Sequence, residues 1–204
     1  MSSKDLILAR IRQALGDRPQ SPEIPRDYRR GAGKADLDLL VERLVDYRAV
    51  VHRSTDVAAT IRDIIGGGTL VVPPGLPSEW LPPSAVVDDD LPADRIAAAD
   101  GVVTAAAVAI AETGTIVLDA SADQGRRILS LLPDLHICVL RPEQVVSSVP
   151  EAVARLDPRR PLTWISGPSA TSDIELNRVE GVHGPRNLHV ILLGGPDASS
   201  EAAP

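Results

Sequence analysis

Between residues 162 and 193 the chain reads LTWISGPSATSDIELNRVEGVHGPRNLHVILL. This stretch begins and ends with short apolar runs, 163–165 and 189–193, whose composition is typical of β-strands. Small residues, carboxylates, a histidine and an arginine crowd the segment between the two runs. Turns between strands do not require so many ionisable side chains, so any ligand site of this protein is expected here.

The loop after the first of these strands carries hydroxyl groups and carboxylates. Ser169 and Thr171, together with free backbone N–H groups, suit a carboxylate or phosphate ligand. The position is also suitable, because ligands of open α/β sheets bind at the carboxyl ends of strands. Asp173 and Glu175 would repel such an anion unless they bind its hydroxyl groups, pair with Arg186 or hold a metal ion. Alternatively, Ser172 or Asp173 caps a helix that follows the loop.

A histidine flanked by glycines follows in the sequence GVHGPR, residues 181–186. His183 is expected to be accessible and to titrate near neutral pH, which suits acid–base chemistry. Arg186 can bind a carboxylate through two parallel hydrogen bonds. Alternatively, His183 only hydrogen-bonds the preceding loop and fixes it. No metal site is predicted, because His183 and His189 lack the spacing of a metal-binding pair.

A second polar cluster, AETGT at residues 111–115, joins two apolar runs that are expected to be paired strands. The hydroxyl groups of Thr113 and Thr115 and the flexible backbone of Gly114 can hold a polar ligand. Glu112 can act there as a base or a nucleophile. The structural alternative is an ordinary hairpin turn, in which Thr-Gly is favourable.

Helical and strand patterns alternate along the middle of the chain. An apolar stripe with helical spacing over 37–45 is followed by a strand at 49–52, a helix that ends at glycines 66–68 and a buried strand at 69–72. This alternation predicts a mostly parallel sheet with helices on its faces. Further expected elements are strands 85–88 and 136–140 and helices 92–99, 124–132 and 151–156.

Two arginines, Arg126 and Arg127, fall in the helix expected over 124–132. The simpler interpretation is a solvated first turn of that helix. The other is that they face the same cleft as the polar segment after residue 162, because a predicted strand ends just before them.

The N-terminal segment is expected to be separate from the main domain. Residues 2–15 form an amphipathic pattern with a capping box between Ser2 and Asp5, and a proline-containing polar linker follows. The chain therefore divides into an arm (1–34), an α/β domain (35–194) and a disordered tail (195–204). The arm docks on a partner, on another copy in a homo-oligomer, or back on its own domain.

Composition excludes several classes of protein. The net charge of −7 opposes nucleic-acid binding, which needs clustered cations. The single cysteine, Cys138, excludes an internal disulfide and any iron–sulphur cluster or zinc site ligated by cysteines of this chain alone, and its apolar neighbours predict a buried thiol. No apolar run is long enough to span a membrane, and the charged N-terminus is unlike a signal peptide, so a cytoplasmic protein is expected.

Four segments together resemble the LUD-domain family. They are AETGTIVLDAS (111–121), DQGRR (123–127), SLLPDLHICVL (130–140) and GPSATSDIELNRVEGVHGPRNLHVILL (167–193). The resemblance extends over roughly 36–194, and the N-terminal helix with its linker also resembles the N-terminal region of a family member. It implies a three-layer α/β/α fold similar to that of the sugar-phosphate isomerase and CoA-transferase group.

The same resemblance implies a role in L-lactate utilization. Family members work beside two partner proteins, at least one of which carries iron–sulphur clusters, and together they oxidise L-lactate to pyruvate. This chain is then expected to be a subunit that holds no cofactor itself. In transferases of this fold group a glutamate near a glycine turn is the nucleophile, which draws attention to Glu112.

Two other functions remain open. One is a small-molecule transferase or isomerase acting on a carboxylate or phosphate substrate. In it Glu112 is the base or nucleophile, His183 its proton partner, and Arg186 binds the anion together with Ser169 and Thr171. The other is a scaffold that uses the helix at 2–15 as a docking arm.

Overall fold

The main sheet of the protein is entirely parallel. A computed structural model describes residues 2–16, 22–28, 35–172, 178–180 and 184–194. Six strands pair in the order β1-β12-β7-β4-β2-β3, and every pairing between them is parallel. Their bounds are β1 Val50–Ser54, β2 Leu70–Val72, β3 Val86–Val87, β4 Gly101–Thr104, β7 Leu135–Leu140 and β12 Asn187–Leu193. The mostly parallel sheet predicted from the alternation of helices and strands is therefore confirmed.

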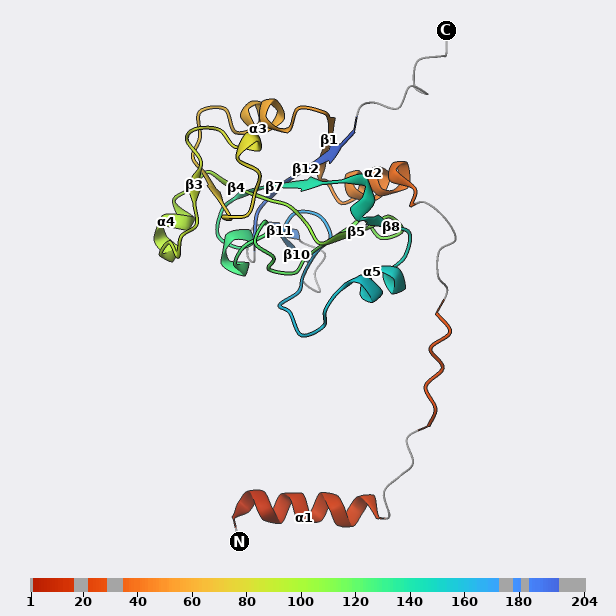
Figure 1. The fold of residues 1–204 in the computed structure, drawn as a ribbon. Helices are drawn as coiled ribbons and strands as arrows, with labels where there is room; N and C mark the ends of the chain where they lie inside the picture. Colours follow the sequence, from red (N-terminus) through yellow and green to blue (C-terminus); the bar gives the residue numbers. More distant parts are fainter. Residues whose placement is uncertain (1, 17–21, 29–34, 173–177, 181–183, 195–204) are drawn as a thin grey trace.

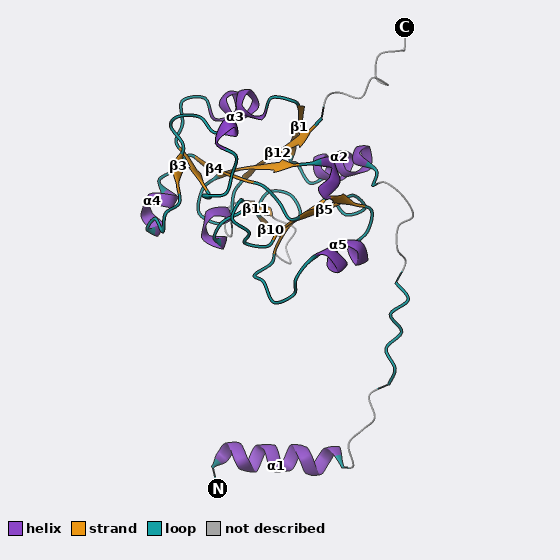
Figure 2. Ribbon diagram, viewed as in Figure 1, coloured by secondary structure: helices purple, strands orange, loops and turns teal. Residues whose placement is uncertain are grey.

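Helices cover both faces of this sheet because successive strand residues point to opposite sides. In β12, Val190 and Leu192 pack in the cluster that contains the inner face of α2 (Leu37–Asp46). Ile191, between them, packs on the other face in the cluster that contains the inner face of α3 (Val57–Ile65). A short helix, α4 (Ala93–Ala97), packs through Ile96 beside β2 and β4. The expected α/β fold with helices flanking the sheet is thus confirmed (Figure 2).

A second, four-stranded sheet lies on the α2 side of the main sheet. Its order is β8-β5-β6-β9, with bounds β5 Val108–Ile110, β6 Thr115–Leu118, β8 Val145–Val146 and β9 Thr163–Ile165. Its inner residues share the α2 cluster, and its outer residues pack against α5 (Val149–Arg155). The chain passes from β4 in one sheet to β5 in the other through alanines 105–107, so the apolar run that precedes the predicted turn is divided between two sheets.

The smaller elements show where local sequence patterns misled. The helix expected over 124–132 is wrong, because only the 3-10 turn η2 (Arg127–Ser130) forms there. Gly125 has a φ of +72°, which cannot belong to a right-handed helix, and Pro133 follows closely. The remaining short elements are η1 Ser78–Trp80, η3 Pro142–Gln144 and the antiparallel pair β10 Ala170–Ser172 and β11 Arg178–Glu180.

The N-terminal helix α1 (Ser3–Leu15) has the predicted capping box, in which the Ser2 hydroxyl accepts a hydrogen bond from the backbone N–H of Asp5. None of its residues is buried, and its apolar residues Leu6, Ile7, Ile11 and Leu15 are exposed. Figure 1 shows the helix apart from the domain. The predicted tail, 195–204, lies outside the described residues. No helix in the described parts of the chain combines the length and apolarity needed to cross a membrane.

The hairpin predicted around residues 112–114 is confirmed, since β5 and β6 pair antiparallel with Ile110 opposite Thr115. Its turn packs under α2. Gly114 has a φ of +61°, and a Cβ built on it would lie 2.7 Å from Cβ and 2.9 Å from the carbonyl carbon of Arg43. The glycine is therefore required by backbone conformation and by the proximity of α2.

We predict that Gly114→Ala destabilises the domain by about 3 kcal/mol, the sum of left-handed backbone strain and overpacking. Gly66→Ala is the matched control, because Gly66 has a φ of +60° but nothing within 4 Å of its added Cβ. Its ψ of −121° lies outside the left-handed helical region, so backbone strain alone should cost about 2 kcal/mol, still less than the loss at Gly114. Urea unfolding of both variants measures the difference, and equal losses would show that contact with α2 is not what selects glycine at 114.

Candidate functional site

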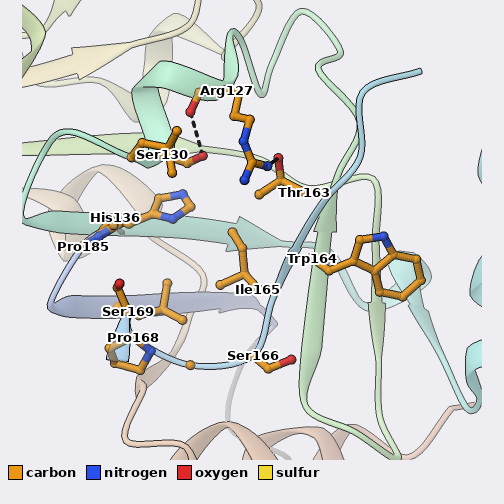
Figure 3. A pocket seen from close by; sticks show the side chains of 14 residues that line it. Arg127, Ser130, His136, Thr163, Trp164, Ile165, Ser166, Pro168, Ser169 and Pro185 are labelled. Carbon is orange, nitrogen blue, oxygen red and sulfur yellow. Dashed lines mark hydrogen bonds between the residues drawn. The ribbon is translucent and has the colours of Figure 1, made fainter. Parts of the chain in front are cut away.

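A cavity of about 260 Å³ opens between the second sheet and the main sheet. Its lining residues come from three segments, 127–131, 163–169 and 184–188, and from the strand residue His136. Figure 3 shows the side chains of these segments around the space. Two of the segments belong to the stretch 162–193, in which the sequence predicted a ligand site. Leu188 and Ile165 provide apolar surface that is continuous with the core cluster under α2.

The cavity lies at the amino ends of main-sheet strands, which differs from expectation. His136 and Leu188 are the second residues of β7 and β12. The loop after β9 does follow the carboxyl end of a strand, as predicted. However, β9 belongs to the second sheet, where it runs antiparallel to β6, so the rule for open parallel sheets does not apply to it.

Two consecutive arginines point to different partners at the start of η2. The Arg126 guanidinium donates to both carboxylate oxygens of Asp88, at 2.9 and 2.6 Å, and to Asp90 at 3.0 Å. These hydrogen bonds hold the pKa of the Asp88 carboxyl below its usual range. Arg127 instead lines the cavity, where its Nη1 donates to the Thr163 hydroxyl at 2.8 Å. The expectation that these arginines face the polar segment after residue 162 thus holds for Arg127.

Hydroxyl groups connect the cavity to the hairpin turn. Thr113 donates to the Thr115 hydroxyl at 2.9 Å, and Thr115 shares a hydrogen bond of 2.9 Å with the hydroxyl of Ser166. Ser166 lines the cavity, whereas Thr113, Gly114 and Thr115 do not. The second polar cluster, 111–115, is therefore connected to the cavity through the hydrogen bond between Thr115 and Ser166.

His136 is the buried polar group of the site. Only 1% of its surface is exposed, and its Nε2 shares a hydrogen bond of 2.8 Å with the Thr104 hydroxyl on the neighbouring strand β4. Burial lowers the pKa of the ring from 6.5 to about 4, because the charged form would lose its hydration. The ring is therefore neutral at physiological pH.

Glu112 points away from the cavity. Its side chain is exposed, and its Oε1 accepts a hydrogen bond of 2.9 Å from the backbone N–H of Val149 at the start of α5. The Glu112 backbone N–H donates to Ser147 at 3.2 Å, which also ties the turn to the segment before α5. The catalytic role of Glu112 stays a prediction.

Arg186 binds a carboxylate of the protein itself. Its Nε and Nη2 donate to the two oxygens of Asp134 at 2.6 and 2.9 Å. This pairing lowers the pKa of the Asp134 carboxyl, and the Arg186 side chain remains 57% exposed. Arg186 is not among the residues that line the cavity, although its neighbour Pro185 is.

The other predicted residues divide between the cavity and the parts of the chain that are not described. Ser169 lines the cavity, and its backbone N–H donates to Pro185 at 2.8 Å. The backbone of Thr171 lies in β10. Asp173, Glu175 and His183 lie outside the described residues, so their roles stay predictions.

Sequence reasoning did not select His136, Ser130, Thr163 or Ser166, which also line the cavity. The available signal was a histidine that interrupts the apolar run of β7, LHICVL. In that same run the buried Cys138 has its thiol pKa raised to about 12 by desolvation, so the thiol stays protonated. No three His, Cys, Asp or Glu side chains of the described residues gather closely enough to hold a metal ion.

Comparison with known proteins gives consistent relatives. The LUD domain family model matches residues 85–193. Lactate utilization protein C of Deinococcus radiodurans is 50% identical over 163 residues, which covers 75% of this chain and 77% of that protein. Lactate utilization protein C of Geobacillus thermodenitrificans is 26% identical over 233 residues, covering 95% and 97% of the two chains. The crystal structure of a DUF162 family protein from Deinococcus radiodurans has a TM-score of 0.67 and 41% sequence identity, covering 78% of this chain and 96% of that one.

We predict that His136 makes the domain less stable in mild acid. The unfolded ring binds a proton near pH 6.5 and the folded ring only near pH 4, so the unfolded state takes up more protons between these values. Replacing the ring by an amide in His136→Gln should therefore remove roughly 3 kcal/mol of the loss in unfolding free energy between pH 7 and pH 4.

Urea unfolding at a series of pH values measures this difference between the wild type and the variant. His52 and His189, whose pKa values are also lowered by burial, are present in both proteins and cancel in the comparison. Parallel stability–pH curves for the two proteins would show that His136 is not held neutral in the fold.

Proposed function

This chain belongs to the LUD domain family, and we propose that it is a component of a cytosolic system that oxidises L-lactate to pyruvate. The observation that carries the proposal is 50% identity to a protein named Lactate utilization protein C, of which the chain covers 77%. Relatives with this name support a role in lactate utilization; the oxidation and its partners are our inference.

We further propose that the electrons of the reaction are held by iron–sulphur partner proteins. A cluster of the usual type is held by several cysteine thiolates, and this chain has one cysteine. That cysteine, Cys138, is fully buried in the core and its Sγ lies 3.8 Å from the carbonyl oxygen of Ala105. The contribution of this chain is then to bind a ligand or a partner, not to hold a cluster.

A second candidate is a transferase or isomerase that acts on a carboxylate or phosphate substrate. The hydroxyl chain from Thr113 through Thr115 to Ser166 favours it, because this chain links the turn that contains Glu112 to the cavity. The orientation of the Glu112 carboxylate toward Val149 favours the first proposal. The two candidates therefore differ in what they require of Glu112.

Deletion of the gene should abolish growth on L-lactate as the sole carbon source and leave growth on pyruvate intact, because the chain acts before pyruvate is formed. Re-expression from a plasmid should restore growth on L-lactate. Normal growth of the deletion strain on L-lactate, in a genome without a second copy, would contradict the proposal.

The variant Glu112→Gln should restore growth on L-lactate as well as the wild type does. A glutamine keeps an oxygen that can accept the hydrogen bond from the Val149 N–H, so the turn and the start of α5 stay in place. Growth rates of the complemented deletion strain measure the outcome. If the folded variant fails to restore growth, the carboxylate has a chemical role and the transferase or isomerase candidate gains the support.

A further inference from the structure

We infer that the cavity at the amino ends of β7 and β12 binds a small 2-hydroxy or 2-oxo monocarboxylate, with Arg127 on its carboxylate and His136 on its 2-oxygen. The choice of a small monocarboxylate follows from the side chains that line the cavity. The choice of an acid with an oxygen at the 2-position, such as L-lactate or pyruvate, rests on the proposed function.

The charge of the cavity selects an anion with a single charge. Of the described residues that line it, Arg127 carries the one permanent charge. Its hydrogen-bond partner is the neutral hydroxyl of Thr163, whereas Arg126 and Arg186 each bind a carboxylate of the protein. In a chain with a net charge of −7, a guanidinium that faces hydroxyl groups in a cavity is suited to a carboxylate supplied by a ligand.

Neighbouring hydroxyl groups extend this anion site. Thr163 accepts a hydrogen bond from Arg127, so its own hydroxyl proton can be donated to a second carboxylate oxygen. Ser130, one turn of η2 after Arg127, donates to the Arg127 carbonyl at 3.1 Å and thereby fixes the backbone from which the guanidinium extends. Figure 3 shows Arg127 reaching from this turn to Thr163 across the space that Ser130 also lines.

His136 supplies a second, neutral recognition group. Its Nε2 shares a hydrogen bond with the Thr104 hydroxyl, which leaves Nδ1 as the ring nitrogen for a ligand in the cavity that His136 lines. If Thr104 donates to Nε2, Nδ1 carries the proton and donates to a 2-oxo or 2-hydroxy oxygen. If Thr104 accepts from Nε2, Nδ1 accepts the proton of a 2-hydroxyl group. The ring thus suits both oxidation states of the acid.

Size and polarity restrict the rest of the ligand. A volume of about 260 Å³ admits a small organic acid. The apolar side chains of Leu131, Ile165 and Leu188 line the remainder and suit a short alkyl group. A phosphate dianion would meet a single cation among the described residues that line the cavity, so a monocarboxylate is the better match.

Isothermal titration calorimetry of the purified full chain tests this inference with L-lactate, pyruvate, acetate and inorganic phosphate. We expect saturable binding of L-lactate or pyruvate and at least tenfold weaker binding of acetate and phosphate, since acetate lacks the 2-oxygen. Absence of binding by either 2-oxygenated acid, or tighter binding of phosphate, would overturn the inference.

Two variants and a control assign the roles. Arg127→Met should weaken binding of the acid at least tenfold, and the control Arg62→Met, on α3 across the sheet, should leave it unchanged. His136→Gln should weaken binding of the 2-oxygenated acid more than it weakens binding of acetate. Wild-type affinity of a folded Arg127→Met protein would contradict the assignment.

The outcome is separable from that of the growth experiment. A deletion strain that grows normally on L-lactate, together with a purified protein that binds the acid through Arg127, overturns the proposed function and leaves the site. A strain that needs the gene for growth on L-lactate, together with a protein that binds neither acid, overturns the site and leaves the function.

Discussion

The fold depends on the close packing of a small second sheet against one face of the parallel sheet. Small buried residues make this contact possible: Ala106 and Ala109 from the second-sheet side meet Cys138 and Leu140 of β7 in one cluster. The alanines end at Cβ, so the backbones approach closely without a cavity between them. Because β9 pairs at the edge of this second sheet, the packing leaves β9 beside the first residues of β7 and β12, and the cavity forms there.

Electrostatic pairing then distinguishes the cavity from its surroundings. Arg126 and Arg186 are sequence neighbours of the lining residues Arg127 and Pro185, and each forms an ion pair with a carboxylate of the protein, Asp88 and Asp134 respectively. Among the described residues, the Arg127 guanidinium hydrogen-bonds to the neutral hydroxyl group of Thr163, and His136 is kept neutral by burial. The described lining therefore combines one cation, several hydroxyl groups and an apolar wall, which is a suitable environment for a small organic anion.

Much of this architecture could be predicted from periodicity. The apolar stripes of α2 and α3 and the short β-rich runs gave the alternation of a parallel sheet, and the turn at Gly114 was recognised as a hairpin. Periodicity could not show that the chain changes sheets between β4 and β5, because both strands are equally apolar and fully buried. The helix expected at 124–132 did not form because Gly125 has a φ of +72°. A Cβ at this position would also contact Pro73, which lies far away in the sequence.

The site was predictable as a region more than as a set of residues. The segments 163–169 and 184–188 belong to the stretch that the sequence singled out. Arg186 pairs with Asp134, which is 52 positions away in the sequence. His136 lines a cavity because β9 belongs to the second sheet. Local sequence patterns indicate neither of these long-range contacts. For Asp173, Glu175 and His183 the predictions stand as the sequence made them.

The central claim is that this cavity, and not the turn that contains Glu112, is where the protein meets its small-molecule ligand. The most direct measurement is a ¹H–¹⁵N NMR titration of the full chain with pyruvate. The account predicts amide shifts concentrated in 127–136, 163–169 and 184–188. Shifts centred on 112–115 with none at Arg127 and His136, or no saturable shifts at all, would contradict it.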